Sequence, residues 1–388
     1  MSFARTSEVV FWLNAGAIFY VYIGYPVLVY LLGLIRSLPP QKNTIVPTVT
    51  IIITAYNEEL HILEKLENTL RIDYPREKLQ IIVASDCSND TTDEIVSSFR
   101  DQGVMLVRQP VRHGKTSAQN LAVESAVGDI LLFSDATTMY GSDVLQKLLP
   151  AFADSSVGCV TGSLVYVDST DSNVGSGAKS YWNYESSLRR GESNVCSLVG
   201  ASGCMYAVRR SAYKPMYPEA CSDFLIASVV FRQGMRTVFE PDAVCTEETN
   251  REYKKELKMR VRVIAQTLFD LWKNKDLFNP VKFGFYSVAL FSHKLLRYLL
   301  PFFFFGLFVS CAIASYYSVF YLGVLILQSL FFMAAFAGWI LDRLNYKLGP
   351  FSLPFYFVMT HIASILGWYK FLRGERYSFW EPARENAS

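Results

Sequence analysis

The sequence predicts an α/β domain with a mostly parallel, doubly wound sheet, anchored by membrane-spanning helices on both sides. Two observations lead to this expectation. Long stretches near both ends of the 388-residue chain lack charged residues, and between them short β-branched runs alternate with runs of helical spacing. With 51% hydrophobic and 19% charged residues the chain is neither disordered nor fibrous. Its net charge of +2 indicates no nucleic-acid partner, and its seven cysteines form no C-x-x-C pair, which argues against a disulfide scaffold or a zinc module.

The charge-free stretches predict the spans in order. Residues 9–35 are long enough for one tilted helix, since about 20 apolar residues cross a bilayer, and a cleaved signal peptide would have a shorter apolar part. Residues 298–341 suit two helices with a turn near 314–318, and residues 348–369 form a third apolar run. Residues 283–296 mix aromatic and basic side chains, which is typical of an interfacial helix.

Basic residues next to the spans predict the orientation. Arg36 and Lys42 follow the first span, and Lys282, Lys294 and Arg297 precede the second. Because positive residues favour the cytoplasmic face, we expect a multi-pass protein of the inner (plasma) membrane with a cytosolic domain and an outside N-terminus. The expected parts are a first span (9–35), a soluble domain (43–280, with a basic interfacial helix at about 252–276), a helical part with two or three C-terminal spans (281–372) and a polar tail (373–388).

The polar tail conflicts with a simple count of spans. Four complete crossings would place Lys370, Arg373, Arg376 and Arg384 on the far side of the membrane. Either the last apolar run enters the membrane and returns, or the tail departs from the positive-inside tendency.

Within the soluble domain, strands and helices are expected to alternate. Residues 47–54, PTVTIIIT, have the uninterrupted β-branched character of a strand buried on both faces. Leucines at helical spacing follow in 57–70, and Asp90 is a plausible N-cap for a helix at 91–99. The remaining expected elements are strands at 79–86, 104–109 and 129–135 and a helix at 116–127. Short loops between them favour parallel strands.

Polar clusters end three of these strands, at 54–58, 86–90 and 135–137. Ligands of such sheets bind beyond the carboxyl ends of the strands. The sequence contains neither G-x-G-x-x-G after the first strand nor a complete P-loop, since residues 112–116 lack the upstream glycine. A classical dinucleotide or P-loop site is therefore excluded.

The residues in these clusters suit a nucleotide with a metal ion. Asp86 can accept a hydrogen bond from a base or a ribose hydroxyl, and Lys115 can face phosphate. Asp135 can hold Mg²⁺ or Mn²⁺, both of which prefer oxygen ligands. The alternative is that each aspartate only caps the helix or turn that follows it.

Four segments, PTVTIIITAYNEE, IIVASDCSNDTTDEI, RHGKTSAQNLAV and GDILLFSDATT, resemble in this order the GT-A domain of membrane-integrated family 2 glycosyltransferases. Relatives include synthases of hyaluronan, cellulose, chitin and poly-N-acetylglucosamine. The resemblance covers about residues 46–270. It implies a nucleotide-diphosphate sugar donor, usually a UDP-sugar, and a glycan or lipid acceptor at the bilayer.

The resemblance also implies roles for individual residues. Lys115 stands in a G-K-x4-N pattern with Asn120, and Arg262 remains from an incomplete Q-x-x-R-W motif, whose Trp position is Val263. Asp135 would be the first acid of the D-x-D metal motif, but Thr137 replaces the second. The implied nucleotide-sugar-binding residues are Thr54, Ala55, Tyr56, Glu58, Asp86, Lys115, Asp135 and Arg262, and the implied metal ligands are Asp135 and Thr137.

On the acceptor side, the segment VGASGCMYAVRR contains Ser202, Gly203 and Cys204, where small residues would let the backbone approach a sugar. A tight turn packed on the sheet is the alternative. Asp223 would be the general base that deprotonates the acceptor hydroxyl; the alternative is a solvated helix cap.

The expected function is therefore an inverting, metal-dependent glycosyltransferase that builds an exo- or capsular polysaccharide. Because the Q-x-x-R-W motif is incomplete, transfer of a single sugar to polyprenyl phosphate or diacylglycerol is an alternative. A second alternative is a membrane protein that binds a nucleotide-sugar without catalysis.

Overall fold

The computed structural model describes residues 3–167, 173–248, 253–344, 346–347, 349–377 and 379, without the side chains of 3–4 and 173–183. The chain forms two compact units. The sheet unit contains residues 36–167, 182–249 and 375–388, and the helical unit contains residues 1–35, 168–181 and 250–374. The predicted domain boundary at residue 280 remains a prediction.

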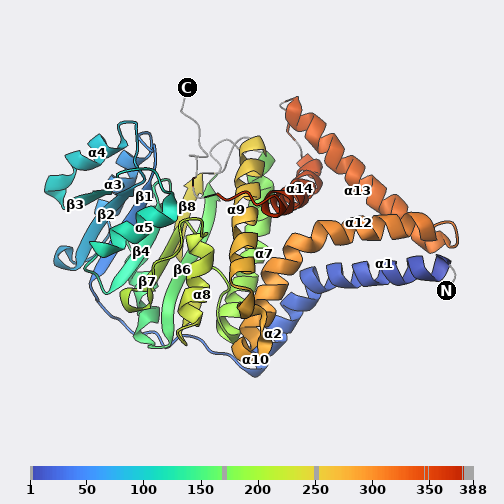
Figure 1. Cartoon of the computed structure of the whole chain (residues 1–388), viewed down its shortest axis with the longest axis horizontal. Coiled ribbons are helices and arrows are strands. Elements are labelled where there is room, and N and C mark those ends of the chain that lie inside the picture. Colours follow the sequence, from blue (N-terminus) through green and yellow to red (C-terminus); the bar gives the residue numbers. More distant parts are fainter. Residues whose placement is uncertain are drawn as a thin grey trace. The chain divides into compact units, whose positions relative to one another are not determined.

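The first half of the sheet unit matches the expected alternation (Figure 1). Strands β1 (Val49–Ala55), β2 (Leu79–Ser85), β3 (Val104–Arg108) and β4 (Ile130–Asp135) lie in the order β3-β2-β1-β4, and every neighbouring pair is parallel. Helices α3 (Ile62–Leu70), α4 (Thr92–Ser98) and α5 (Lys115–Glu124) connect them. The predicted parallel, doubly wound arrangement is thus present in this half.

Alternate residues of β1 face two separate hydrophobic cores. Ile51 and Ile53 pack in one core with Ile62 of α3, whereas Ile52 packs in the other with Ala118 of α5. All three isoleucines are fully buried. This explains why the strand reads as a continuous apolar run rather than an alternating one.

Helix α3 begins at Ile62, five residues later than the leucine spacing predicts. Asn57 adopts a left-handed conformation, with φ of 52°. The backbone N–H groups of Asn57 and Glu58 donate to the side chains of Ser88 and Thr92, at 3.2 and 2.8 Å. These bonds to the next loop replace the first helical turn, because they satisfy the same donors that a helix start leaves open.

The second half of the sheet makes it mixed rather than wholly parallel. Strand β7 (Met205–Arg209) is antiparallel to β4 and to β6 (Val157–Val167), while β8 (Arg236–Glu248) is parallel to β6 and β5 (Met139–Tyr140) is antiparallel to β8. The helices here are α6 (Val144–Leu148), α8 (Ser222–Phe231) and α7 (Asn173–Val195), whose residues from 182 on belong to the sheet unit.

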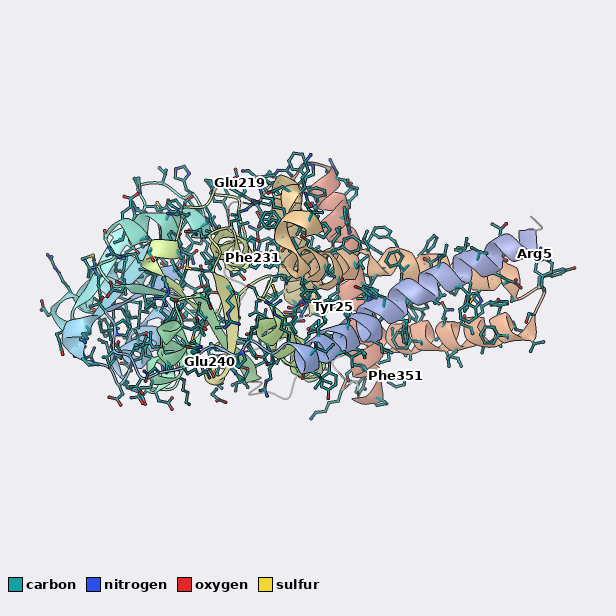
Figure 2. All side chains as sticks on the ribbon, turned by 90° about the horizontal axis from the view of Figure 1, so that it is seen from below. Arg5, Tyr25, Glu219, Phe231, Glu240 and Phe351 are labelled. Carbon is teal, nitrogen blue, oxygen red and sulfur yellow. The ribbon has the colours of Figure 1, made fainter. Side chains whose placement is uncertain are left out.

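The helical unit contains four helices that are long and apolar enough to cross a membrane. The first, 5–35, consists of α1 (Phe3–Phe19), a π-helical turn (Tyr20–Gly24) and α2 (Tyr25–Ile35), and Figure 2 shows it running from Arg5 through Tyr25. The others are residues 285–314, α13 (Val319–Arg343) and residues 349–372, which include α14 (Ser352–Leu372). The predicted turn at 314–318 is therefore confirmed.

The separate interfacial helix expected at 283–296 is not observed. After α10 (Pro280–Phe283), α11 (Phe285–Leu290), a π-helical turn (Phe291–Leu295) and α12 (Leu296–Ala314) form one continuous helix. The Tyr20 hydroxyl lies 2.8 Å from Ser292 Oγ, so a hydrogen bond joins the two π-helical turns. The basic side chains of this segment therefore interrupt the apolar pattern without ending the helix.

Helix α9 (Tyr253–Lys273) follows the sheet unit in sequence and packs along α14. A Cβ atom on Gly367 would lie 2.6 Å from Ile264 Cγ2, so the two helices approach closely there. Arg260 donates a hydrogen bond to the Tyr356 hydroxyl. The predicted basic helix at about 252–276 is thus present, and its lipid contact remains a prediction.

Candidate functional site

The polar ends of three strands meet at one edge of the sheet. In the strand register, Thr54 pairs with Asp135 and Ala55 pairs with Ser85, directly before Asp86. Because these parallel strands run in the same direction and this register aligns their carboxyl ends, these residues lie at the same edge of the sheet. The adjacency expected from the sequence is therefore present in the structure.

The centre of this edge is a lysine between two carboxylates. Lys115, the first residue of α5, forms an ion pair with Asp135. A Cβ atom on Gly203 would lie 3.0 Å from Asp223 Oδ2 and 3.6 Å from Lys115 Nζ, so Asp223 and the Lys115–Asp135 pair meet beside this glycine through the lysine. Burial alone would lower the pKa of Lys115, but Asp135 and Asp223 outweigh it and raise that pKa above its usual value.

Asp223 lies in the first turn of α8, and its surroundings hold it in place. Its carbonyl accepts a hydrogen bond of 2.9 Å from the Ala201 N–H, and its Oδ1 accepts one of 3.2 Å from Cys221 Sγ. The Ser202 N–H donates to Thr161 Oγ1 at 3.0 Å. The structure thus brings the predicted acceptor segment, the predicted base and Lys115 together.

A residue that the sequence analysis missed lies beside them. Glu247, near the end of β8, accepts hydrogen bonds from Thr137 Oγ1 at 3.2 Å and from Cys204 Sγ at 3.1 Å. Burial, and then the Glu247 charge, raise the pKa of the Cys204 thiol well above its usual value. Glu247 lies near the end of a strand, as Asp86 and Asp135 do, but the sequence analysis predicted no strand at residues 236–248.

These oxygen atoms suit a hard divalent cation. In the part of the chain that the structure describes, no three His, Cys, Asp or Glu side chains lie close enough to hold an ion by themselves. Mg²⁺ is commonly held by one or two carboxylates together with substrate phosphates, however. Asp135 and Glu247, with the Thr137 hydroxyl, are compatible with that pattern.

The turn that carries Asp135 and Thr137 rests on a fully buried lysine. Lys65 of α3 donates to Ser134 Oγ at 2.8 Å and to the Thr138 carbonyl, and its ammonium lies 3.8 Å from the centre of the Tyr140 ring. The hydrogen bonds and the aromatic face stabilise the buried charge.

Asp86 belongs to a second cluster at the same edge. Its carboxylate accepts hydrogen bonds from Gln109 Nε2 and from the N–H groups of His113 and Gly114, at 2.8 to 3.0 Å. The residue is fully buried, and desolvation raises its pKa despite these bonds. In this structure Asp86 therefore organises residues 109–114, and Arg112 of that loop stacks 3.6 Å from the centre of the Tyr56 ring.

Other predicted donor residues are bonded within the protein. Thr54 Oγ1 accepts from Gln119 Nε2 at 3.2 Å, and the Glu58 carboxylate lies 3.2 Å from His61 Nδ1. Asn120, of the G-K-x4-N pattern, accepts from the Tyr213 hydroxyl at 2.7 Å and so holds a neighbouring loop.

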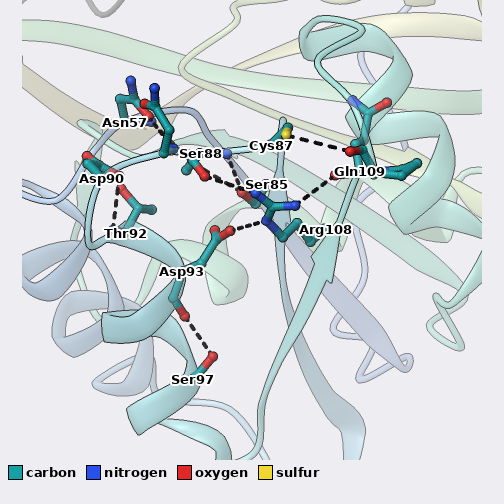
Figure 3. A network of polar contacts seen from close by, with 12 residues as sticks. Asn57, Ser85, Cys87, Ser88, Asp90, Thr92, Asp93, Ser97, Arg108 and Gln109 are labelled. Carbon is teal, nitrogen blue, oxygen red and sulfur yellow. Dashed lines mark hydrogen bonds and ion pairs between the residues drawn. The ribbon is translucent and has the colours of Figure 1, made fainter.

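The loops after β1 and β2 are fastened to each other (Figure 3). Asn57 accepts from the Asn89 N–H at 3.0 Å, and Asp90 accepts from the Thr92 N–H at 3.0 Å. Arg108 donates to Asp93 at 2.6 Å and to the Ser88 carbonyl at 3.1 Å. Thr91 rather than the predicted Asp90 is the N-cap of α4, and Asp90, one residue earlier, accepts from the first helical residue within a network that fixes the edge of the site.

For two predicted features, a place in this site remains a prediction. Arg262 lies on α9 in the helical unit, and its contact with the donor remains a prediction. Of the polar tail at 373–388, residues 378 and 380–388 lie outside the described residues.

Comparisons with known proteins agree with this geometry. Residues 50–216 match the family model described as "Glycosyl transferase family 2". The chain is 25% identical over 295 residues to the Bacillus subtilis protein named "Probable glycosyltransferase YdaM", covering 72% of this chain and 69% of that protein. It is 27% identical over 248 residues to an N-acetylglucosaminyltransferase of Rhizobium meliloti, covering 60% and 58%. A poly-beta-1,6-N-acetyl-D-glucosamine synthase of Staphylococcus aureus is 24% identical over 234 residues, covering 58% and 52%.

A solved structure extends the similarity to the fold. The mannosyltransferase PcManGT from Pyrobaculum calidifontis, in complex with GDP-Man and Mn²⁺, has a TM-score of 0.71 and 22% identity, covering 96% of this chain and 99% of that chain. The predicted α/β fold with apolar helices is thereby confirmed. Residues 50–216 form a family 2 glycosyltransferase domain with the GT-A fold, and the protein is a glycosyltransferase.

Proposed function

We propose that the protein is a membrane-bound, inverting glycosyltransferase that uses a nucleotide-diphosphate sugar to build an exo- or capsular polysaccharide. The observation that carries the proposal is that Lys115, which is paired with Asp135, and Asp223 both lie beside Gly203. A cation beside one carboxylate suits an anionic leaving group, and the second carboxylate is available as a base.

The reaction is a single displacement. The acceptor hydroxyl oxygen attacks the anomeric carbon of the donor sugar while the bond from that carbon to the diphosphate oxygen breaks. Asp223 takes the hydroxyl proton, and the nucleoside diphosphate leaves with the bonding electron pair. Lys115 stabilises the negative charge that develops on the diphosphate.

A bound Mg²⁺ or Mn²⁺ would add Lewis-acid stabilisation of the leaving diphosphate. Asp135 and Glu247, aided by the Thr137 hydroxyl, are the protein groups that would hold it. The mannosyltransferase of the same fold was solved with Mn²⁺. Arg262 is proposed as a further cation for the diphosphate.

The donor is proposed to be a UDP-sugar. This follows the resemblance of the 54–58 and 86 segments to polysaccharide synthases and agrees with relatives named for N-acetylglucosamine transfer. The similar solved fold holds GDP-Man, so a guanosine nucleotide is the first competitor to test. Glycan or lipid acceptors would approach through Ser202, Gly203 and Cys204.

The four long apolar helices support a place in a membrane. We propose the inner (plasma) membrane, with the sheet unit in the cytosol, because basic residues follow the first helix and precede the second.

An Asp223→Asn variant tests the assignment of the base. It should lose turnover by at least about a hundredfold, the usual scale of general-base catalysis, while the Kd of the donor stays unchanged. Asp101→Asn, at an exposed aspartate, is the matched control and should keep wild-type turnover. Donor binding that falls in parallel with turnover would contradict the assignment of Asp223 as the base.

Transfer of one sugar to polyprenyl phosphate or diacylglycerol is the second candidate function. Val263, where the family has tryptophan, removes an aromatic platform for a growing sugar chain and favours this alternative. Products from labelled donor should be sized after incubation in membranes. A polymer or a ladder supports polysaccharide synthesis, and a single organic-soluble product supports the lipid acceptor.

A further inference from the structure

A residue of the C-terminal segment lies against the donor edge of the sheet unit. The Arg112 guanidinium contacts two aromatic rings, 3.6 Å from the centre of Tyr56 and 5.2 Å from the centre of Phe379. Phe379 belongs to the segment after α14, and the described residues of this segment, 375–377 and 379, group with the sheet unit rather than with the helices that precede them. The segment therefore returns to the catalytic domain.

The position of this stack connects it to the donor. Tyr56 follows β1 directly, and Arg112 Nε lies 3.9 Å from the Asp86 carboxylate, in the loop that Asp86 organises. Phe379 is the outer layer of the stack, with 49% of its surface exposed. A phenylalanine held over a guanidinium restricts its orientation through a cation–π contact.

We propose that Arg112 binds the nucleoside diphosphate part of the donor and that Phe379 positions Arg112 for it, so that the C-terminal segment completes the donor site. The inference rests on the proposed function, since it assigns two further residues to the same site. The ligand class is a nucleoside diphosphate, whose negative charge and flat base are both partners for a guanidinium.

The proposal also fixes the side of the membrane on which the chain continues after α14. With the N-terminus outside and the sheet unit in the cytosol, residues 285–314 lead outward and α13 leads back, so α14 begins on the cytosolic side. Phe379 must share that side to reach Arg112. Helix α14 therefore begins and ends in the cytosol and does not cross.

The contacts of α14 support this independently. It packs along α9 through Gly367 and Tyr356, and α9 carries a run of cations that would be costly in the hydrocarbon core: Lys254, Lys255, Lys258, Arg260 and Arg262. Helix α14 also packs against α12, where Trp368 Nε1 donates to the Tyr298 carbonyl at 2.9 Å, so the pairing with α9 supports an interfacial position for the face of α14 that meets α9. Lys370, Arg373 and Arg376 then lie in the cytosol, in line with the positive-inside tendency.

Nucleotide binding by the purified full-length protein tests the proposal. Calorimetry with UDP and with GDP, at fixed Mn²⁺, compares the wild type with Arg112→Ala, Phe379→Ala, the double variant and Phe379→Trp. Phe379→Ala should raise the Kd about three- to tenfold, the scale of a cation–π contact, and the double variant should bind no more weakly than Arg112→Ala. Phe379→Trp should bind like the wild type. Tyr316→Ala, at an exposed aromatic residue of the helical unit, is the control.

Each of the other outcomes contradicts a particular part of the proposal. If the wild type binds nucleotide and Phe379→Ala binds equally well, or if the two single effects add, Phe379 does not act through Arg112 and the inference falls. If the wild type binds neither nucleotide, the proposed function falls with it. A fluorescent protein fused after Ser388 should fold and fluoresce in bacterial cells, whereas a C-terminus exposed outside the membrane would overturn the inference.

Discussion

Replacing Gly203 by alanine would disturb the site through a single methyl group. The new Cβ would lie 3.0 Å from Asp223 Oδ2 and 3.6 Å from Lys115 Nζ. Ordinary contacts of a Cβ begin near 3.4 Å, so the Asp223 carboxylate would have to move by a few tenths of an ångström. The backbone of Gly203 is not in the left-handed region, so alanine adds no conformational strain of that kind.

We expect Gly203→Ala to lower turnover rather than to impair folding. A misplacement of about 1 Å can cost about a hundredfold in rate, so a smaller shift should lower kcat about tenfold, which corresponds to about 1.4 kcal/mol in the activation free energy. The KM of the donor should change little, because the methyl group would clash with the Asp223 carboxylate but lie at an ordinary contact distance from Lys115. Steady-state release of nucleoside diphosphate measures both quantities.

A matched control separates this effect from a general one. A Cβ added to Gly323 of α13 would meet no atom within 4 Å, so Gly323→Ala should keep wild-type kcat. A Gly203→Ala variant with unchanged kcat would refute the proposed role of the Asp223 carboxylate. A raised KM of the donor with an unchanged kcat would refute it too, because the added methyl group would then disturb donor binding rather than the base.

Two further predictions concern a carboxylate of the site and one remote from it. Glu247→Gln should raise the Mn²⁺ concentration that gives half-maximal activity by about tenfold, the scale of losing a ligand or its partner, and metal titration of turnover would measure it. At Asp154, burial raises the pKa, but hydrogen bonds from Ser156 and Gln41 and from Arg236 outweigh it and lower the pKa to about 2. The stabilisation is therefore present above the ordinary carboxyl pKa and disappears as the pH falls towards about 2. Because solvent screens these surface contacts, Asp154→Asn should lower the free energy of unfolding by about 1 kcal/mol at pH 7 and much less near pH 2, measured by denaturant titration at each pH.

The first half of the fold was predictable because its signals are local. The run from Val49 to Ala55 is apolar at nearly every position because both faces of β1 are covered, and such a run indicates a buried parallel strand without other information. The start of α3 was not predictable. It depends on hydrogen bonds from Asn57 and Glu58 to side chains about thirty residues away, which the leucine spacing does not report.

The residues of the candidate site were also predictable only in part. Lys115 and Asp135 stand in recognisable sequence patterns, and the strand register brings the polar ends of β1 and β4 together. Glu247 was missed because only the order of the sheet brings the end of β8 to Thr137. Arg112 stood in an incomplete P-loop pattern and at the start of the segment RHGKTSAQNLAV without a role of its own, and its partner Phe379 is separated from it by the whole helical part of the chain.

The most direct test of the central claim is the release of nucleoside diphosphate from a panel of sugar nucleotides, measured side by side for the purified wild type and Asp223→Asn with Mg²⁺ or Mn²⁺. Our account predicts rapid release from one donor, with a UDP-sugar first, by the wild type only. Wild-type-like release by Asp223→Asn, or no release from any donor by the wild type, would contradict it.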